Sequence, residues 1–186
     1  GLKIGGLLSK GIPLGHQTGF DSGSTLDYVY RNEARGVPLV GTAIDRTYLD
    51  SPGWRGIRQR KLHVEELLRE AMRRVAAAGQ PVRVTDIAAG HGRYVLDAVL
   101  GSEIKPQAVV LRDYSDINVR DGRALIEAKG LQGVARFDQA DAFDRASLAA
   151  IEPKPTVGVV SGLYELFENN PMVGRSLAGL AEAIPV

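Results

Sequence analysis

The sequence predicts an α/β fold, a parallel sheet flanked by helices, with an N-terminal extension ahead of it. From residue 55 onward, apolar strand-like runs alternate with amphipathic helix-like runs, which is typical of a parallel sheet covered on both faces. Small or acidic residues follow each strand-like run, at the edge where ligands bind in open α/β sheets. We therefore expect an extension over 1–54, a sheet domain over 55–186, and strands in the spatial order third, second, first, fourth.

The composition limits the kinds of site that the chain can carry. The 186 residues are 44% hydrophobic and 24% charged, with a net charge of +1 and no cysteine. Disulfides and thiolate metal sites are therefore excluded, and no global field attracts nucleic acid or an anionic membrane. No apolar run approaches the ~20 residues that span a bilayer. A cytoplasmic protein without a transmembrane segment is the expectation.

Residues 1–54 are rich in glycine, proline, serine and threonine, and they carry turn signals at 11–13 and 21–23. No strong hydrophobic period runs through them. The sequence predicts only short helical or extended pieces here, one of them around 24–32. Three tyrosines of this region suit either half-buried positions or the wall of a ligand site, and these are Tyr28, Tyr30 and Tyr48.

A long helix is predicted next, because apolar residues recur at the spacing of one helix face. Gly79 and Pro81 are expected to end it. Its predicted apolar face comprises Val64, Leu67, Leu68, Ala71, Met72 and Val75.

Four strands follow, and a helix is predicted after each of them. We expect the strands at 82–87, 108–113, 134–139 and 157–161. Since parallel sheets are buried on both faces, their apolar side chains should lie in the core. The side chains expected to be buried are Val84, Ile87, Val109, Val110, Val157 and Val159.

The helices between the strands carry capping signals. Ser115 or Asp116 is expected to cap the helix after the second strand, and Asn170 the last helix. The helix after the third strand is short, over 144–151. The last helix is expected to bury the stripe Val173, Leu177, Leu180 and Ile184.

The turn after the first strand carries the main chemical signal. The strand delivers an acidic residue, Asp86, and the small residues Ala88, Gly90 and Gly92 then lead into the next helix. Small residues let the backbone pass close to a ligand, and a helix N-terminus offers free N–H groups to oxygen atoms. A tight strand–helix connection without a ligand is the alternative interpretation.

Polar and small residues also follow the other three strands. Asp113 ends the second strand about 20 residues after the glycines, where an acid accepts hydrogen bonds from ribose hydroxyls in dinucleotide-type folds. Asp141 follows the third strand, where a carboxylate can accept from an adenine amino group. Ser161 and Gly162 follow the fourth strand. Together these positions predict one ligand site at the carboxyl ends of the strands.

The run from 84 to 93 resembles motif I of class I S-adenosylmethionine-dependent methyltransferases, an acid followed by three alternating glycines, with alanine in place of the first glycine. The sequences of 93–97 and 161–167 resemble those of a bacterial subgroup of these methyltransferases. Members of this subgroup can occur fused to an α/β-hydrolase-like domain. The resemblance covers about 55–186. It implies a Rossmann-like fold and S-adenosylmethionine as the cofactor.

By this resemblance, the first turn would surround the methionine portion of the cofactor, through Asp86, Ala88, Gly90 and Gly92. The family's last three strands have no counterpart here, because the sequence ends where another strand is expected. A sheet truncated after the fourth strand is the expectation that follows.

The resemblance assigns the remaining site residues to other parts of the cofactor. Asp113 would hold the ribose hydroxyls, and Asp141 would accept from the adenine amine. Ala142 would pack beside the adenine ring. The methionine end would be lined by Ser161 and Gly162.

Other classes of function fit the residues less well. A NAD(P)-binding Rossmann domain needs a small residue three positions after the second glycine, where this chain has the bulky Val95. A serine hydrolase needs Gly-x-Ser-x-Gly, and the surroundings of Ser161 miss that spacing. No metal site is expected, since His16, His63 and His91 lack ligand spacing. A non-catalytic nucleotide-binding or regulatory module on the same fold stays open.

Methyl transfer needs a base only where the acceptor is protonated in its reactive form. The candidate bases are Tyr164, Glu165 and His16. The balanced charge favours a small-molecule or lipid acceptor over a nucleic acid. Four cations at the start of the long helix fit either contact with an acidic substrate or a solvated helix start, and these are Arg55, Arg58, Arg60 and Lys61.

Overall fold

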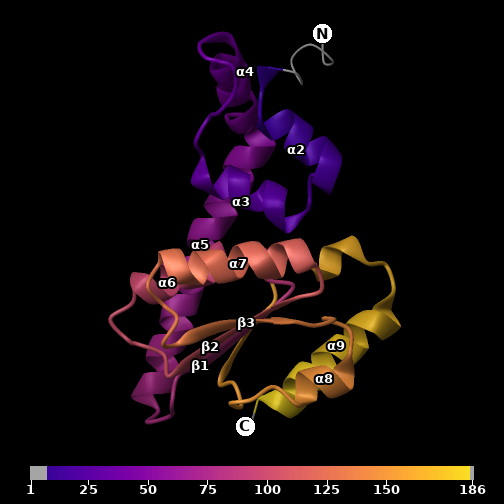
Figure 1. The fold of residues 1–186 in the computed structure, drawn as a ribbon. Helices are drawn as coiled ribbons and strands as arrows, with labels where there is room; N and C mark the ends of the chain where they lie inside the picture. The colour runs from indigo at the N-terminus through magenta and orange to yellow at the C-terminus, as the bar shows by residue number, and fades with distance from the viewer. Residues whose placement is uncertain (1–7, 185–186) are drawn as a thin grey trace. The chain divides into compact units, whose positions relative to one another are not determined.

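The computed structural model describes residues 8–184 (Figure 1). The chain divides into two compact units, Gly1–His63 and Val64–Val186, and the division falls inside the 26-residue helix α5, Pro52–Ala77. The predicted boundary between 54 and 55 falls in the first turn of the same helix. Over the described residues, no helix has the length and hydrophobicity that crossing a membrane requires.

The N-terminal unit is more regular than its sequence suggests, because helices occupy most of its described residues. Ser22 caps α3 by accepting a hydrogen bond from the Thr25 amide at 3.2 Å, and Asn32 ends that helix in the left-handed conformation, at φ 53°. The helices that precede α5 are α2 (Gly11–Thr18), α3 (Gly23–Arg31) and α4 (Val40–Leu49).

Glycines explain how these helices form without a strong apolar period. A Cβ atom on Gly11 would lie 2.7 Å from the Tyr28 ring, and one on Gly15 would lie 2.4 Å from the Phe20 ring. A Cβ on Gly41 would lie 2.1 Å from the carbonyl oxygen of Leu8. These three glycines, of which Gly11 belongs to a predicted turn signal, therefore serve close packing between segments.

A buried carboxylate joins the segments of this unit. Asp45 has no exposed surface, and its Oδ1 accepts from the Ser9 hydroxyl at 2.6 Å and the Gly11 amide at 2.8 Å. Its Oδ2 accepts from the Arg35 amide at 2.9 Å and from the Tyr28 hydroxyl. Burial alone would raise the pKa of Asp45, but these hydrogen bonds hold it below its ordinary value.

The C-terminal unit contains a four-stranded parallel sheet in the order β3-β2-β1-β4, as predicted. Neighbouring residues in the register include Asp86 with Leu111 and Leu111 with Phe137. The strands are β1 (Arg83–Ile87), β2 (Ala108–Asp113), β3 (Ala135–Gln139) and β4 (Val157–Val159).

The prediction of buried strand residues is right for β1 and β2 and wrong for β4. Side chains of β1, β2 and β3 fill the core, including Val84, Ile87, Val109 and Val110. Val157 and Val159 are only half-buried, and β4 ends before residue 161. The physical reason is that β4 pairs with β1 alone within the described residues, so one of its edges and part of its faces stay uncovered.

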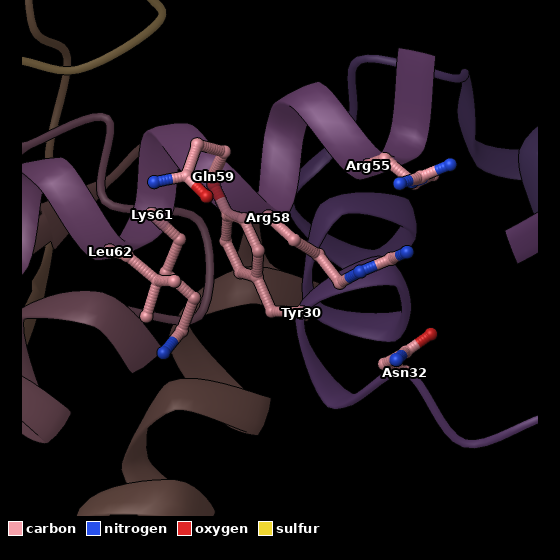
Figure 2. Close-up of a pocket in the computed structure, with 7 residues that line it drawn as sticks. All are labelled: Tyr30, Asn32, Arg55, Arg58, Gln59, Lys61 and Leu62. Carbon is pink, nitrogen blue, oxygen red and sulfur yellow. The ribbon is translucent and has the colours of Figure 1, made fainter. Parts of the chain in front are cut away.

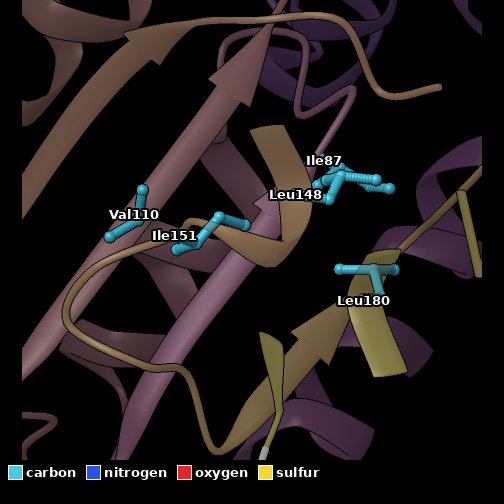
Figure 3. Packing of buried hydrophobic residues seen from close by; sticks show 5 residues of the cluster. All are labelled: Ile87, Val110, Leu148, Ile151 and Leu180. Carbon is cyan, nitrogen blue, oxygen red and sulfur yellow. The ribbon is translucent and has the colours of Figure 1, made fainter. Parts of the chain in front are cut away.

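Helices cover both faces of the sheet. Figure 1 shows α6 and α7 on one face, and α8 and α9 on the other. On the second face, Ile87 and Val110 from the sheet pack against Leu148, Ile151 and Leu180 (Figure 3). The elements are α6 (Arg93–Leu100), α7 (Asp116–Ala128), α8 (Arg145–Ala149), the 3-10 helix η1 (Tyr164–Leu166) and α9 (Asn170–Ala183).

Three details of the helix predictions are corrected. The cap of α9 is Asn169, whose side chain accepts from the Met172 amide at 3.2 Å, and Asn170 is the first helical residue. Leu67 and Leu177 were expected in the core but are exposed. The buried stripe of α5 in this unit runs through positions 65, 68 and 72, and that of α9 through 176, 179, 180 and 183, so both leucines lie beside it.

Small residues also let α9 approach α8 closely. A Cβ atom on Gly179 would lie 2.8 Å from the carbonyl oxygen of Arg145 and 2.8 Å from the Cβ of Leu148. The cap at Ser115 is confirmed, since its side chain accepts from the Asn118 amide at 3.4 Å.

Candidate functional site

The turn between β1 and α6 has an unusual backbone. Ala88, Gly90 and Gly92 have φ angles of 55°, 59° and 71°, all in the left-handed region. Glycine adopts this region freely, whereas alanine does so at a cost of about 1–2 kcal/mol. The amide of Ala89 donates to the Arg112 carbonyl at 2.9 Å, which fixes the turn against β2. Strain of this kind concentrates at functional sites, so the conformation of Ala88 makes this turn a candidate functional site.

Gly92 has a structural reason to be glycine. A Cβ atom there would lie 2.4 Å from Cδ1 of the fully buried Leu111. The positive φ and this close approach together disfavour a side chain even without a ligand. The identity of Gly92 is therefore explained by the fold and does not itself indicate a cofactor.

Asp113 joins the turn to the next helix. Its Oδ2 accepts from the Gly90 amide at 2.9 Å, while its Oδ1 accepts from the Ser115 amide at 3.0 Å and from Nδ2 of Asn118 at 3.1 Å. A carboxylate offers about four acceptor positions, so these three bonds leave capacity for a further donor. The structure thus brings together Gly90 and Asp113, which the sequence placed on two different strands of the same site.

Asp86 lies at the centre of the sheet, between β2 and β4, and is completely buried. Neither carboxylate oxygen makes a hydrogen bond of normal geometry within the described residues. Burial raises the pKa of this carboxyl to about 8; the nearby Tyr94 hydroxyl lowers it and the charge of Asp113 raises it. Asp86 is thus a completely buried acid beneath the strained turn, with the Tyr94 hydroxyl as its side-chain neighbour.

The loops after β3 and β4 are tied together through α9. The Tyr164 hydroxyl is 2.9 Å from Oγ of Ser176, which in turn donates to the carbonyl oxygen of Ala142 at 2.6 Å. Ser176 is completely buried. Two residues predicted for the site, Ala142 and Tyr164, are therefore linked by a serine that sequence reasoning missed. Its signal was a small polar residue inside an otherwise apolar helix stripe.

The rings of Phe143 and Phe167 add an apolar contact between the same two loops. Their centroids are 4.8 Å apart and the rings meet at 71°, an edge-to-face arrangement. Asp141 is exposed, and its Oδ1 accepts from the Phe143 amide at 2.8 Å. Ser161 and Gly162 are half-buried, and Gly162 has a φ of 80°. The loop residues expected around the cofactor thus lie at the edge formed by the carboxyl ends of the strands, where hydrogen bonds and a ring contact join the two loops.

Arg112 is a second residue that sequence reasoning missed. This cation is buried in β2, and it donates to the Ser147 carbonyl at 3.0 Å and to the Ser147 hydroxyl. Burial lowers the pKa of its guanidinium. The signal was a charged residue inside an apolar strand, and its role here is to fix α8 against the sheet beside the candidate site.

The three candidate bases have different surroundings. The Tyr164 hydroxyl donates a hydrogen bond to Oγ of Ser176. Glu165 is exposed in η1. His16 is exposed on α2 of the N-terminal unit, where its ring meets Phe20 at a centroid distance of 5.3 Å. Of the three, Tyr164 is the one that the structure connects to another predicted site residue.

Comparison with solved structures agrees with this architecture. A "possible exported protein" from Bordetella parapertussis superposes with a TM-score of 0.63 at 15% identity, over 86% of this chain and 50% of that one. The bifunctional kinase-methyltransferase WbdD superposes with a TM-score of 0.50 at 23% identity, over 73% of this chain and 30% of that one. At such identities the likeness concerns the fold.

Comparison of sequences gives closer relatives. The uncharacterized protein YnbC of Escherichia coli strain K12 is 53% identical over 183 residues, which are 98% of this chain and 31% of YnbC. The chain thus spans about a third of the length of that relative. A family model described as "Putative methyltransferase" matches residues 1–186. The Rossmann-like sheet, the turn at Asp86–Gly92 and this match over the whole length lead to one assignment: the chain belongs to that methyltransferase family.

Proposed function

We propose that this chain binds S-adenosylmethionine at the carboxyl ends of β1–β4 and takes part in transferring its methyl group. The observation that carries the proposal is the hydrogen bond from the Gly90 amide to Asp113, formed inside a turn that holds Ala88 in a strained conformation. This hydrogen bond holds the Asp113 side chain beside the backbone of Gly90, which has no Cβ atom to cover it. Membership of a methyltransferase family supports the same activity.

The residues of the first turn suit the methionine portion of the cofactor. Ala88, Gly90 and Gly92 form a turn of small residues, and Asp86 beneath it has two acceptor oxygens without normal partners among the described residues. A buried acceptor suits a positively charged ammonium group, because a nearby cation favours the ionised carboxylate. When bound, the sulfonium supplies an activated methyl group, and the protein has to position the acceptor and exclude water.

The remaining residues suit the nucleoside portion. Asp113 has capacity for one more donor, as a ribose hydroxyl requires. Asp141 is exposed and uses Oδ1 for the Phe143 amide, which leaves Oδ2 for an adenine amine. Ala142 would pack beside the adenine, and Ser161 and Gly162 would line the methionine end. Tyr164 acts as a positioning residue in this proposal, because its hydroxyl is engaged by Ser176.

The acceptor proposed here is a small molecule or a lipid, since the charges of the chain are balanced. A cytoplasmic location and fusion to a further domain belong to the same proposal, and the share of YnbC that this chain spans is consistent with such a fusion.

Binding of the cofactor can be tested by isothermal titration of the chain with S-adenosylmethionine and with S-adenosylhomocysteine, using NAD as the competing class. We expect both adenosyl compounds to bind and NAD not to. Asp141→Asn should weaken binding about tenfold without changing the melting temperature, because this exposed side chain makes one local hydrogen bond. Glu103→Gln, an exposed position in the loop before β2, provides the matched loss of charge and should have no effect.

Asp113→Asn should weaken binding more strongly, but it also disturbs three hydrogen bonds of the fold, so its melting curve must be compared. Absence of binding by either adenosyl compound to folded protein, or preferential binding of NAD, would overturn the proposal.

A further inference from the structure

A cleft of about 420 Å³ lies in the N-terminal unit, between the first half of α5 and the end of α3 (Figure 2). This volume falls in the range of small-molecule sites. Three cationic side chains line the cleft, Arg55, Arg58 and Lys61, and none of the described residues that line it is acidic. The local excess of positive charge contrasts with the chain as a whole, whose net charge is +1.

The placement of these cations is unfavourable for the helix that carries them. Arg55, Arg58 and Lys61 are spaced three residues apart, and like charges at this spacing repel one another on a helix. Arg55 also lies in the first turn of α5, at the positive end of the helix dipole. The nearest acidic residues in the sequence are Asp50, five positions before Arg55, and Glu65, four positions after Lys61. A bound anion would relieve this repulsion.

Three arginines elsewhere in the same unit are paired with acidic residues. Arg55 differs, because its guanidinium makes no hydrogen bond or ion pair with the residues that the structure describes. The pairs elsewhere in the unit have N–O distances of 3.1 Å for Arg31–Asp27, 2.6 Å for Arg35–Glu33 and 3.7 Å for Arg46–Asp50.

Arg58 is held in place by the protein. It donates to the Leu49 carbonyl at 2.8 Å and lies 3.9 Å from Oδ1 of Asp50, which partly neutralises it. The cleft thus combines a guanidinium fixed by the fold with a second one, Arg55, that can turn toward a ligand. Guanidinium groups match the geometry of carboxylate and phosphate oxygens.

We propose that this cleft binds a small organic anion, a carboxylate or a phosphate ester carried on a flat or apolar group. The charged part would contact Arg55, Arg58 and Lys61. The apolar part would lie against Tyr30 and Leu62, whose side chains line the same cleft (Figure 2). The proposal concerns the N-terminal unit alone and does not depend on methyl transfer.

The first experiment titrates the chain with phenyl phosphate and with benzoate, which distinguish a phosphate ester from a carboxylate. Inorganic phosphate and phenol are titrated as well, because they represent the charged part and the aromatic part of the ligand separately. Trp54, the single tryptophan, is the neighbour of Arg55 in the sequence and provides a fluorescence signal beside calorimetry. We expect phenyl phosphate or benzoate to bind and to raise the melting temperature, and phenol not to bind. Failure of both aromatic anions, or inorganic phosphate binding as tightly as phenyl phosphate, would overturn the proposal.

The second experiment separates a site from a general attraction of anions. The double variant Arg55→Gln/Lys61→Gln should bind the aromatic anion at least about tenfold more weakly, the effect expected for losing charged hydrogen bonds. The control Arg73→Gln/Arg74→Gln removes two exposed charges further along the same helix and should bind as the unchanged chain does. Equal losses in both double variants would show nonspecific attraction and contradict the site.

Discussion

The two units of the chain are stabilised in different ways. The C-terminal unit has a sheet whose apolar side chains fill a core, as in the cluster of Ile87, Val110 and Leu148. The N-terminal unit has a much smaller buried apolar cluster, Tyr28, Val29 and Leu49, and adds glycine contacts and a fully buried carboxylate, Asp45. A small unit that buries little apolar surface thus relies on a polar network whose members are satisfied.

The difference also bears on how each unit tolerates change. Apolar packing is distributed over many contacts, so the loss of one side chain removes part of the total. A polar hub concentrates its contribution in one group, because all of its partners lose their acceptor together. We therefore expect the N-terminal unit to be the more sensitive to a single substitution.

The largest expected effect is that of Asp45→Ala. It removes the acceptor of four donors, those of Ser9, Gly11, Tyr28 and Arg35, and should cost about 3–5 kcal/mol. Amide hydrogen exchange should show loss of protection in the N-terminal unit while β1–β3 stay protected. Asp50→Ala, at an exposed carboxylate with long ion pairs, serves as the control. Equal loss of protection in both units would show that they unfold together, and it would contradict the greater sensitivity of the N-terminal unit.

The next effect tests close packing in the C-terminal unit. Gly92→Ala introduces a Cβ 2.4 Å from Leu111 at a φ of 71°, and should cost about 2–4 kcal/mol in denaturant unfolding. Gly130 has nearly the same φ, 68°, but its added Cβ would meet nothing within 4 Å. Gly130→Ala should therefore cost only about 1 kcal/mol, the backbone share of the effect. Equal costs for the two variants would mean that Leu111 moves aside freely and that Gly92 is not required for packing.

A third effect, which builds up over several pH units rather than at one condition, concerns Asp86. Its pKa of about 8 lies above the unfolded value of 3.8, so the folded protein keeps a proton that the unfolded chain has lost between these values. The free energy of unfolding should therefore fall as pH rises through this window, by up to about 1.4 kcal/mol per pH unit. Asp86→Asn should flatten the slope, measured by urea unfolding between about pH 5 and pH 8.

The exposed Asp141→Asn should leave this slope unchanged. An unaltered slope in Asp86→Asn would show that another group carries the pH dependence. If the proposed cofactor pairs with the ionised Asp86, binding should also tighten as pH rises, and this rise should be absent from Asp86→Asn.

The sequence was sufficient to predict the sheet of the C-terminal unit. Its strands are short apolar runs with turn residues between them, and the runs predicted as the first three strands pair in parallel as β1, β2 and β3. The same reasoning placed Asp113 at a strand end and Gly90 in the neighbouring turn. For parallel strands, shared carboxyl ends follow from topology, so a candidate site could be proposed at this edge before its contacts were known.

The sequence could not predict features that depend on partners distant along the chain. Gly11 suggests a turn when considered alone, and only the approach of the Tyr28 ring shows that it serves packing. Ser176 becomes a link between loops only because it meets Tyr164 and Ala142, at separations of 12 and 34 residues.

What the sequence by itself determined is therefore the order of the strands, the turn after β1 and the membership of a family. What only the tertiary structure decided is which small and polar residues serve the fold. Gly92 packs against Leu111, whereas Ala88 keeps a positive φ although it carries a side chain. The physical reason is that hydrophobic periodicity is a local property, while close approach and hydrogen bonding depend on atoms that only the folded chain brings together.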